Sequence, residues 1–146
     1  MQPDRIVVGQ CSGPEVIEVL LAMNAGCQGS LTSAFASSPA DLIRRFVMYG
    51  HMAGQNLPES AISAQIGASI DLIVHMEHRP DGSRVCSSVT AVDLAPEGGV
   101  TLTDLFSRVE REGSPSELSP TGMVPRFQAR LAKSGIVLPD DLYAPR

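Results

Sequence analysis

The first half of the chain alternates short apolar runs with helical periodicities. Residues 6–8 are an all-apolar run that ends at Gly9, a pattern typical of a strand buried on both faces in a parallel sheet. Apolar residues then recur at three- and four-residue steps from Pro14, which suits the first turn of a helix, to Gly26, which stops it. The pattern predicts a strand followed by an amphipathic helix of about three turns.

A second strand and a second helix are predicted next. Residues 31–35 form another β-prone run. Ser37, Ser38 and Pro39 then supply N-cap and first-turn chemistry for a helix that ends at Gly54. Together with the first pair, this order of elements is typical of an α/β fold.

Most of the remaining apolar residues follow a strand pattern. A third helix from about Pro58 leads into the β-prone run 70–78, which the turn signal Pro80–Ser83 separates from a second run at 84–93. We expect an antiparallel hairpin there, and one more strand at 100–106.

The C-terminal part of the chain has a different composition. Residues 110–120 are rich in Ser, Pro, Glu and Gly, and 124–132 can form one last short helix. We therefore predict three segments: an α/β domain with an appended β-meander at 1–109, a linker at 110–122 and a helical tail at 123–146.

Composition and charge limit the classes of function. Of the 146 residues, 43% are hydrophobic and 18% charged, as in a folded domain and unlike a disordered tail. The net charge of −5 argues against a nucleic-acid partner, which requires a basic surface. The basic residues Arg126, Arg130 and Lys133 share one helix face, and we interpret them as a solvated stripe.

Cysteine usage and hydropathy indicate the compartment. The three cysteines, Cys11, Cys27 and Cys86, lie far apart, so neither a disulfide framework nor a zinc knuckle is predicted. The N-terminus lacks a signal-peptide pattern, and no apolar run approaches the about 20 residues of a membrane span. We expect a cytoplasmic protein, with peripheral attachment to an inner-membrane complex left open.

Three local features have both a chemical and a structural interpretation. His75 and His78 have the spacing of a metal-binding pair, but on a strand they point to opposite sides, and no metal site is predicted. Cys27 has no nearby basic residue in sequence that would lower the pKa of its thiol. Ser30 beside Gly29 suits a phosphate-binding turn, although a plain strand entry is favoured.

Seven short motifs in register over nearly the whole chain resemble a known family. They are Pro3–Gly9, Ala22–Gly26, Gly29–Thr32, Gln65–Ile66, Ile70–Val74, Arg79 with Asp81–Arg84, and Thr121–Gly122 with Pro125–Phe127 and Leu138–Pro139. In this order they resemble the secretion traffic ATPases of type II and type IV systems, and most closely the tight-adherence (Flp) pilus assembly ATPases. Pro3–Gly9 resembles the Walker B strand of that family, and Gly29–Thr32 resembles the core of its histidine box.

The resemblance implies the C-terminal half of a RecA-like P-loop NTPase domain. In the family this domain belongs to a hexameric motor that uses ATP and Mg²⁺ to drive pilin assembly or export. By resemblance, the nucleotide-binding positions are Gly9, Gln10, Gly29 and Ser30.

The residues at the chemical positions of the family differ from its pattern. The phosphate-binding motif G-x-x-x-x-G-K-[ST] has no match in the 146 residues. Gln10 stands at the Walker B glutamate, Ser12 at an arginine, and Cys27 and Phe35 at two histidines. Loss of a general base typically costs ~10²–10⁴ in rate, so we do not expect the chain alone to hydrolyse ATP.

Three hypotheses follow from these substitutions. The chain is an inactive homologue that docks with secretion ATPase subunits or with copies of itself, or an ATPase subunit completed by another chain that carries the phosphate loop, or a non-functional gene fragment. The surviving apolar periodicities favour a folded, inactive protein over a decayed one.

Overall fold

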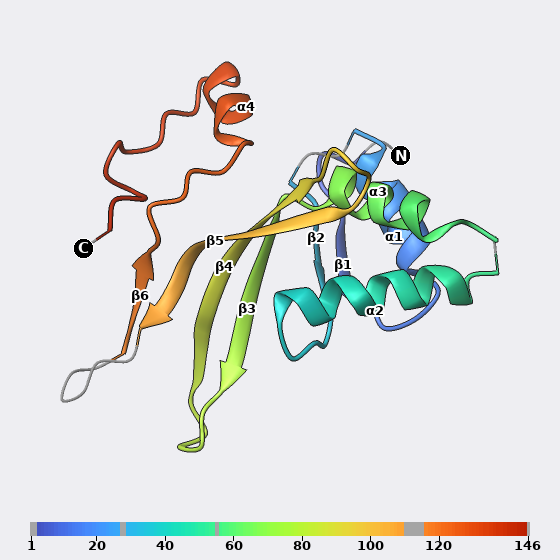
Figure 1. Ribbon diagram of the computed structural model, residues 1–146, viewed down its shortest axis with the longest axis horizontal. Coiled ribbons are helices and arrows are strands. Elements are labelled where there is room, and N and C mark those ends of the chain that lie inside the picture. Colours follow the sequence, from blue (N-terminus) through green and yellow to red (C-terminus); the bar gives the residue numbers. More distant parts are fainter. Residues whose placement is uncertain (1–2, 27–28, 55, 110–115, 146) are drawn as a thin grey trace. The chain divides into compact units, whose positions relative to one another are not determined.

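The computed structural model describes residues 3–26, 29–54, 56–109 and 116–145. These residues form two compact units, one made of 1–70 with 94–101 and the other of 71–93 with 102–146. The elements, labelled in Figure 1, are β1 (Val7–Gln10), α1 (Val16–Asn24), β2 (Leu31–Ser33), α2 (Pro39–Met52), α3 (Glu59–Ser69), β3 (Leu72–His78), β4 (Arg84–Leu94), β5 (Val100–Val109), β6 (Glu117–Pro120) and α4 (Gln128–Lys133).

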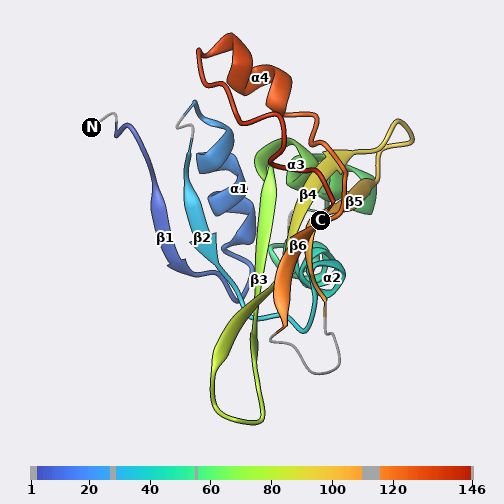
Figure 2. The same ribbon diagram turned by 90° about the vertical axis from the view of Figure 1, so that its left-hand side faces the viewer.

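The first unit combines a short parallel sheet with three helices. β1 and β2 pair in parallel, with Val7 opposite Leu31 and Val8 opposite Thr32. Figure 2 shows the two strands side by side. The helices α1, α2 and α3 contact one another and enclose the main core. The central residues of that core are Cys11, Val16, Ile17, Val19, Leu20, Phe46, Ile62 and Ile66.

The start of α2 confirms the capping chemistry predicted from the sequence. The Ser38 hydroxyl accepts a hydrogen bond from the Asp41 backbone N–H at 3.1 Å, with Pro39 in the first turn. The Asp41 carboxylate in turn accepts from the Ser37 N–H at 3.0 Å and from Arg45 Nε at 2.8 Å. This reciprocal cap satisfies backbone donors that a helix start leaves without partners.

Helices α2 and α3 approach each other closely at Gly50. A Cβ atom added at this residue would lie 2.8 Å from Cγ2 of Ile62 and 3.3 Å from Cδ1 of Ile17. Both isoleucines are buried. The absence of a side chain at Gly50 therefore allows the two helices to pack at this distance.

The prediction that the first strand is buried on both faces is wrong. Val8 packs against the helical core, but its neighbour Val7 is 74% exposed. On β2, the residue opposite Val7 is Leu31, and it is 64% exposed. A strand is buried on both faces only when structure covers both faces, and among the described residues of this unit the helices cover one.

The second unit is an antiparallel sheet with strand order β3-β4-β5-β6. The predicted hairpin between β3 and β4 is confirmed, and its turn is closed by a hydrogen bond from the Ser83 N–H to the Asp81 carboxylate. The register shifts between His75 and Met76, where His75 pairs with Ser88 and Met76 with Cys86. This irregularity places one extra residue in β4, as in a β-bulge.

The C-terminal segment differs from the sequence prediction in two respects. β6 lies inside the predicted linker 110–122, because Glu117–Pro120 pairs with the end of β5; residues 110–115 lie outside the described residues. α4 begins at Gln128, four residues after the predicted start. Apolar side chains of this segment, including those of Phe127 and Tyr143, pack on Ala91 and Leu105, so the sheet and the C-terminal segment share a core.

The fold class is therefore mixed α/β, as the periodicities predicted. A parallel strand pair with helices forms one unit, and an antiparallel sheet forms most of the other. The more specific expectation of a RecA-like P-loop domain stays a prediction.

Candidate docking edge and its polar residues

Two of the predicted site positions, Gly9 and Gln10, meet β2 at the carboxyl end of the parallel strand pair. Gln10 is in register with Ser33, after an irregularity in the pairing. The Cys11 N–H donates to the Ser33 carbonyl at 2.7 Å, and the Ser33 hydroxyl donates to the Gly9 carbonyl at 2.6 Å. These bonds hold the two strand ends together. The exposed Gln10 amide lies at this carboxyl end of the strand pair.

Ser12 belongs to the turn that leads from β1 into α1. Its backbone N–H donates to the Glu15 carboxylate at 2.7 Å. This bond lowers the pKa of Glu15, because it stabilises the ionised form. Burial, reinforced by the nearby Glu15 charge, raises the pKa of the Cys11 thiol, so Cys11 is a core residue and not an activated nucleophile.

Phe35 follows the carboxyl end of β2 and is 76% exposed. An exposed phenyl ring offers no hydrogen bond and is an apolar contact surface. Cys27, the other predicted histidine-box position, lies outside the described residues. Four predicted site residues thus lie at or just after the carboxyl ends of the two strands: Gly9, Gln10, Ser12 and Phe35.

Gly29 and Ser30 lie at the opposite, amino end of the strand pair. The Ser30 hydroxyl accepts from the Ile6 N–H at 3.3 Å, and the Leu31 N–H donates to the Ile6 carbonyl at 2.9 Å. Gly29 has a positive φ of 79°, and the Arg5 side chain lies against its backbone. The structure therefore does not bring Gly29 and Ser30 together with Gln10, although the resemblance places all of them near one nucleotide.

The carboxyl ends of β1 and β2 carry groups that can form hydrogen bonds and an exposed apolar side chain, but few groups that could act as an acid or a base. Gln10 and Ser33 are neutral, and the Glu15 carboxylate is engaged by the turn. No group of three or more His, Cys, Asp and Glu side chains in the described residues is placed to hold a metal ion.

The two histidines of β3 have separate environments. His78 Nε2 accepts a hydrogen bond from Arg84 Nε at 2.9 Å. His75 Nε2 lies 3.6 Å from the Glu77 carboxylate, and the His75 side chain is mostly buried. On a strand, residues three apart face opposite sides, so the pair has no common point to chelate.

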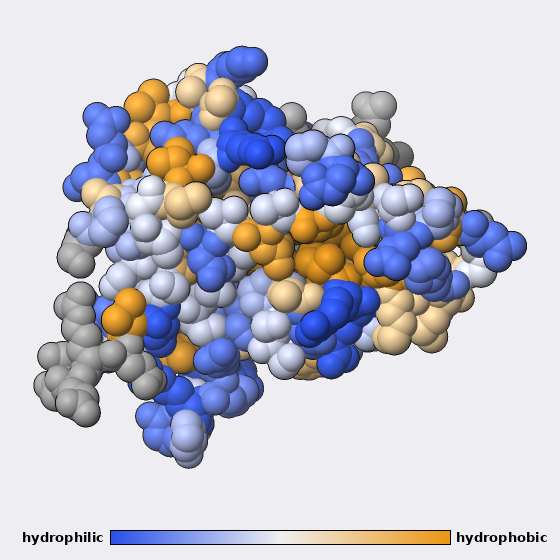
Figure 3. Space-filling model, viewed as in Figure 1, coloured by the Kyte–Doolittle hydropathy of each residue, from blue (hydrophilic) through white to orange (hydrophobic). Residues whose placement is uncertain are grey.

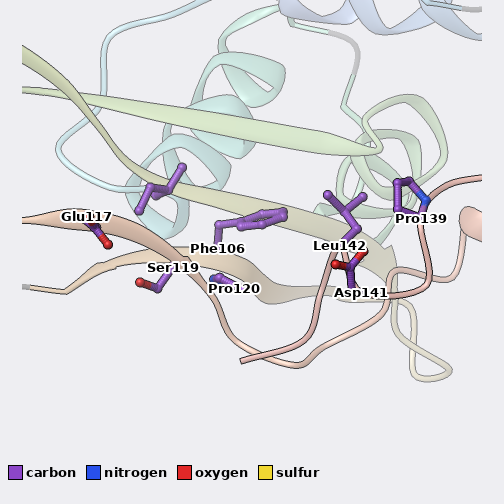
Figure 4. Close-up of a pocket in the computed structure, with 8 residues that line it drawn as sticks. Phe106, Glu117, Ser119, Pro120, Pro139, Asp141 and Leu142 are labelled. Atoms are coloured by element: carbon purple, nitrogen blue, oxygen red, sulfur yellow. The ribbon is translucent and has the colours of Figure 1, made fainter. Parts of the chain in front are cut away.

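A separate concavity of about 400 Å³ lies in the second unit, between β5, β6 and the C-terminal segment. Figure 4 shows Phe106 pointing towards Leu142, with Pro120 and Pro139 nearby. Its acidic side chains are Glu117 and Asp141. The residues that line it include no His, Cys, Lys or Arg.

Hydrophobic side chains also reach the surface outside this concavity. Figure 3 shows hydrophobic patches between hydrophilic residues on one face of the molecule. Among the described residues of the first unit, the large exposed apolar residues are Val7, Leu21, Leu31, Phe35, Met48, Met52 and Leu94. None of the helices in the described part of the chain has the length and hydrophobicity needed to cross a membrane.

The chain is similar to proteins that are named for conjugal transfer. It is 32% identical to such a protein of Mycobacterium tuberculosis over 106 residues, which are 73% of this chain and 29% of that relative. It is also 32% identical over 85 residues, 58% of the chain, to the conjugal transfer protein TrbB of Rhizobium radiobacter, of which it covers 25%. No protein-family model matches the chain. The chain thus spans between a quarter and a third of the length of the curated relatives it matches.

Proposed function

We propose that this chain is a docking component of a type IV secretion or conjugal-transfer machine, and that it does not hydrolyse ATP by itself. The similarity to conjugal transfer proteins supports the setting, and the resemblance to secretion ATPases supports an ATPase subunit as the partner. The finer assignment to a tight-adherence pilus system rests on the sequence resemblance alone.

The observation that carries the proposal is the open side of the β1–β2 pair. Among the described residues, β1 pairs with β2 and with no other strand. In a parallel ladder, alternate residues of a strand bond to one neighbour, so the N–H and C=O groups of Val7 face the other edge. Such an edge is a template for strand addition.

The exposed face beside this edge is apolar. Val7 and Leu31 lie opposite each other in the ladder and are 74% and 64% exposed. Full burial of an aliphatic side chain stabilises by about 1.5–3 kcal/mol, so covering this pair favours association. We infer that a partner adds a strand beside β1 and covers Val7 and Leu31.

The residues at the carboxyl ends of β1 and β2 support a role that does not involve catalysis. Gln10 cannot accept a proton as a glutamate does, and Phe35 has no hydrogen-bonding group. A partner that supplies a phosphate loop would still meet Gln10 and Ser33 at this end of the strands. The alternative is an ATPase whose phosphate loop comes from the partner chain. The experiment described next tests this alternative as well.

The test combines binding and turnover with purified components. The full chain is titrated into the conjugal-transfer or secretion ATPase of the same cell by isothermal calorimetry, and ATP hydrolysis is measured for each protein and for the mixture. We expect saturable binding, and no hydrolysis by the chain alone. ATP hydrolysis by the isolated chain would refute the proposal that it is inactive. Hydrolysis that occurs only when both proteins are present would favour an ATPase that the partner completes.

A pair of valine variants locates the surface. Val7→Asp places a charge on the proposed contact and is expected to weaken binding about tenfold or more. Val137→Asp is the matched control, because Val137 is 86% exposed and belongs to the second unit. Equal affinity of the two variants would exclude the β1 edge as the docking site.

A further inference from the structure

The concavity of the second unit combines apolar side chains with two carboxylates. Figure 4 shows Glu117 and Asp141 on opposite sides of Phe106. The volume of about 400 Å³ lies within the range of about 300–1,000 Å³ that is typical of binding sites. The remaining lining residues are apolar apart from the hydroxyl of one serine: Leu118, Ser119, Pro120, Pro139 and Leu142.

The two carboxylates have no positively charged neighbour to balance them. Glu117 and Asp141 form no ion pair with another residue of the part of the chain that the structure describes. No Lys, Arg or His is among the residues that line the concavity. By contrast, the carboxylates of Asp41 and Asp71 each pair with an arginine. The concavity is therefore complementary in charge to a cation.

The outer edge of β6 beside the concavity offers backbone groups to a ligand. The Thr121 N–H donates to the Leu105 carbonyl of β5 at 2.9 Å. Since alternate residues of an antiparallel strand bond to one neighbour, the N–H and C=O of Leu118, three residues earlier, point away from β5. Among the described residues, β6 has no second neighbouring strand. The other outward residue, Pro120, has no N–H, so Leu118 is where an extended chain would bond.

We propose that this concavity binds an extended segment of a partner polypeptide that carries arginine side chains. The segment lies along the outer edge of β6 and bonds to the backbone of Leu118. Arginine suits the concavity better than lysine, because a planar guanidinium packs on an aromatic ring such as that of Phe106 and pairs with a carboxylate through two hydrogen bonds.

The two carboxylates favour a segment with more than one basic residue. Residues two apart in an extended segment face the same side, so one arginine pairs with Asp141 and a second is directed towards Glu117. This surface belongs to the second unit, and the proposal does not depend on the docking edge of the first.

The test uses the full chain, labelled with ¹⁵N, and the synthetic peptide acetyl-Ala-Arg-Ala-Arg-Ala-amide. Amide NMR spectra are recorded as the peptide is added at constant ionic strength. We expect saturable shifts of the amide signals of Leu118, Ser119 and Leu142. Shifts that do not saturate, or saturable shifts only at other residues, would overturn the proposal.

Two further peptides test whether the guanidinium is recognised. Citrulline has nearly the shape of arginine but no charge, and it replaces both arginines in the first control peptide. We expect this peptide to bind about fivefold more weakly or less tightly still. Equal affinity for the arginine and citrulline peptides would mean that the carboxylates do not recognise the ligand, and the proposal would fail. A peptide with lysine at both positions should also bind more weakly, and binding as tight as that of the arginine peptide would refute the choice of arginine.

Carboxylate variants test whether the concavity itself is the site. Glu117→Gln and Asp141→Asn each remove one charge that lines it and should weaken binding of the arginine peptide about two- to fivefold. Asp140→Asn is the matched control, because Asp140 is exposed, adjacent in sequence to Asp141 and not one of the lining residues. It should change the affinity by less than about 1.5-fold. If Asp140→Asn weakened binding as much as Asp141→Asn, the peptide would sense only the overall negative charge, and the concavity would be excluded as the site.

Discussion

Substitution of two phenylalanines, Phe46 and Phe35, tests which side of the first unit is core and which is open surface. Phe46 on α2 is 1% exposed and lies among the residues of the helical core, whereas Phe35 is 76% exposed. Truncation of a buried phenylalanine to alanine removes its transfer free energy and leaves a cavity, at a cost of about 3–5 kcal/mol. Truncation of an exposed one changes stability by about 0.5 kcal/mol or less.

The expected contrast is large relative to the stability of a domain. A loss of about 4 kcal/mol is a major part of the 5–15 kcal/mol by which native domains are stable. With an m-value of about 2 kcal/mol/M, Phe46→Ala should lower the urea midpoint of the first unit by roughly 2 M. Phe35→Ala should leave this midpoint almost unchanged.

Tyrosine fluorescence makes the measurement specific to the first unit. The chain has two tyrosines and no tryptophan. Tyr49 packs against the first core, and Tyr143 belongs to the core of the second unit. In a Tyr143→Phe background, Tyr49 therefore reports urea unfolding of the first unit.

The outcome bears directly on the docking proposal. If Phe35→Ala destabilised the first unit as much as Phe46→Ala, the Phe35 side would be core and unable to serve as a contact surface. The expected result is the reverse: Phe35→Ala preserves the urea midpoint and can be used to measure the contribution of this ring to binding.

Three further predictions concern single contacts. Ser38→Ala removes the N-cap acceptor of α2 and should lower the free energy of unfolding of the first unit by about 1 kcal/mol, measured by the same urea titration. The pKa of Asp41 is lowered from 3.8 to about 2, chiefly by its hydrogen bond to Arg45. The ionised carboxylate should therefore stabilise the folded state above about pH 3.8, and this stabilisation should be lost as the pH falls through about 2. A carboxyl ¹³C NMR titration that gave an ordinary pKa for Asp41 would contradict this. Leu105→Ala, at a residue 2% exposed in the second core, should cost about 2–5 kcal/mol in urea unfolding followed by Tyr143, and an unchanged midpoint would show that the C-terminal segment does not share that core.

The amino-acid sequence by itself determined the local elements. Periodicity and capping residues located α1 and α2, because the Ser38 hydroxyl and Pro39 act within one turn of the helix that they start. The Asp81–Ser83 turn predicted the β3–β4 hairpin for the same reason, since a tight turn is set by a few neighbouring residues. The strand β6 was missed because Glu117–Pro120 has a turn-like composition and gains its conformation from pairing with β5.

The tertiary structure alone decided which surfaces are open and which distant groups meet. The apolar run at β1 predicted burial on both faces, but exposure of Val7 depends on which elements cover the strand, and no local pattern contains that information. The concavity that joins Phe106, Glu117 and Asp141 arises because antiparallel pairing places β6 beside β5 and the C-terminal segment packs on the same sheet. Local sequence sets backbone preference over a few residues, whereas packing and pairing choose the partners, and in this protein the candidate sites depend on those partners.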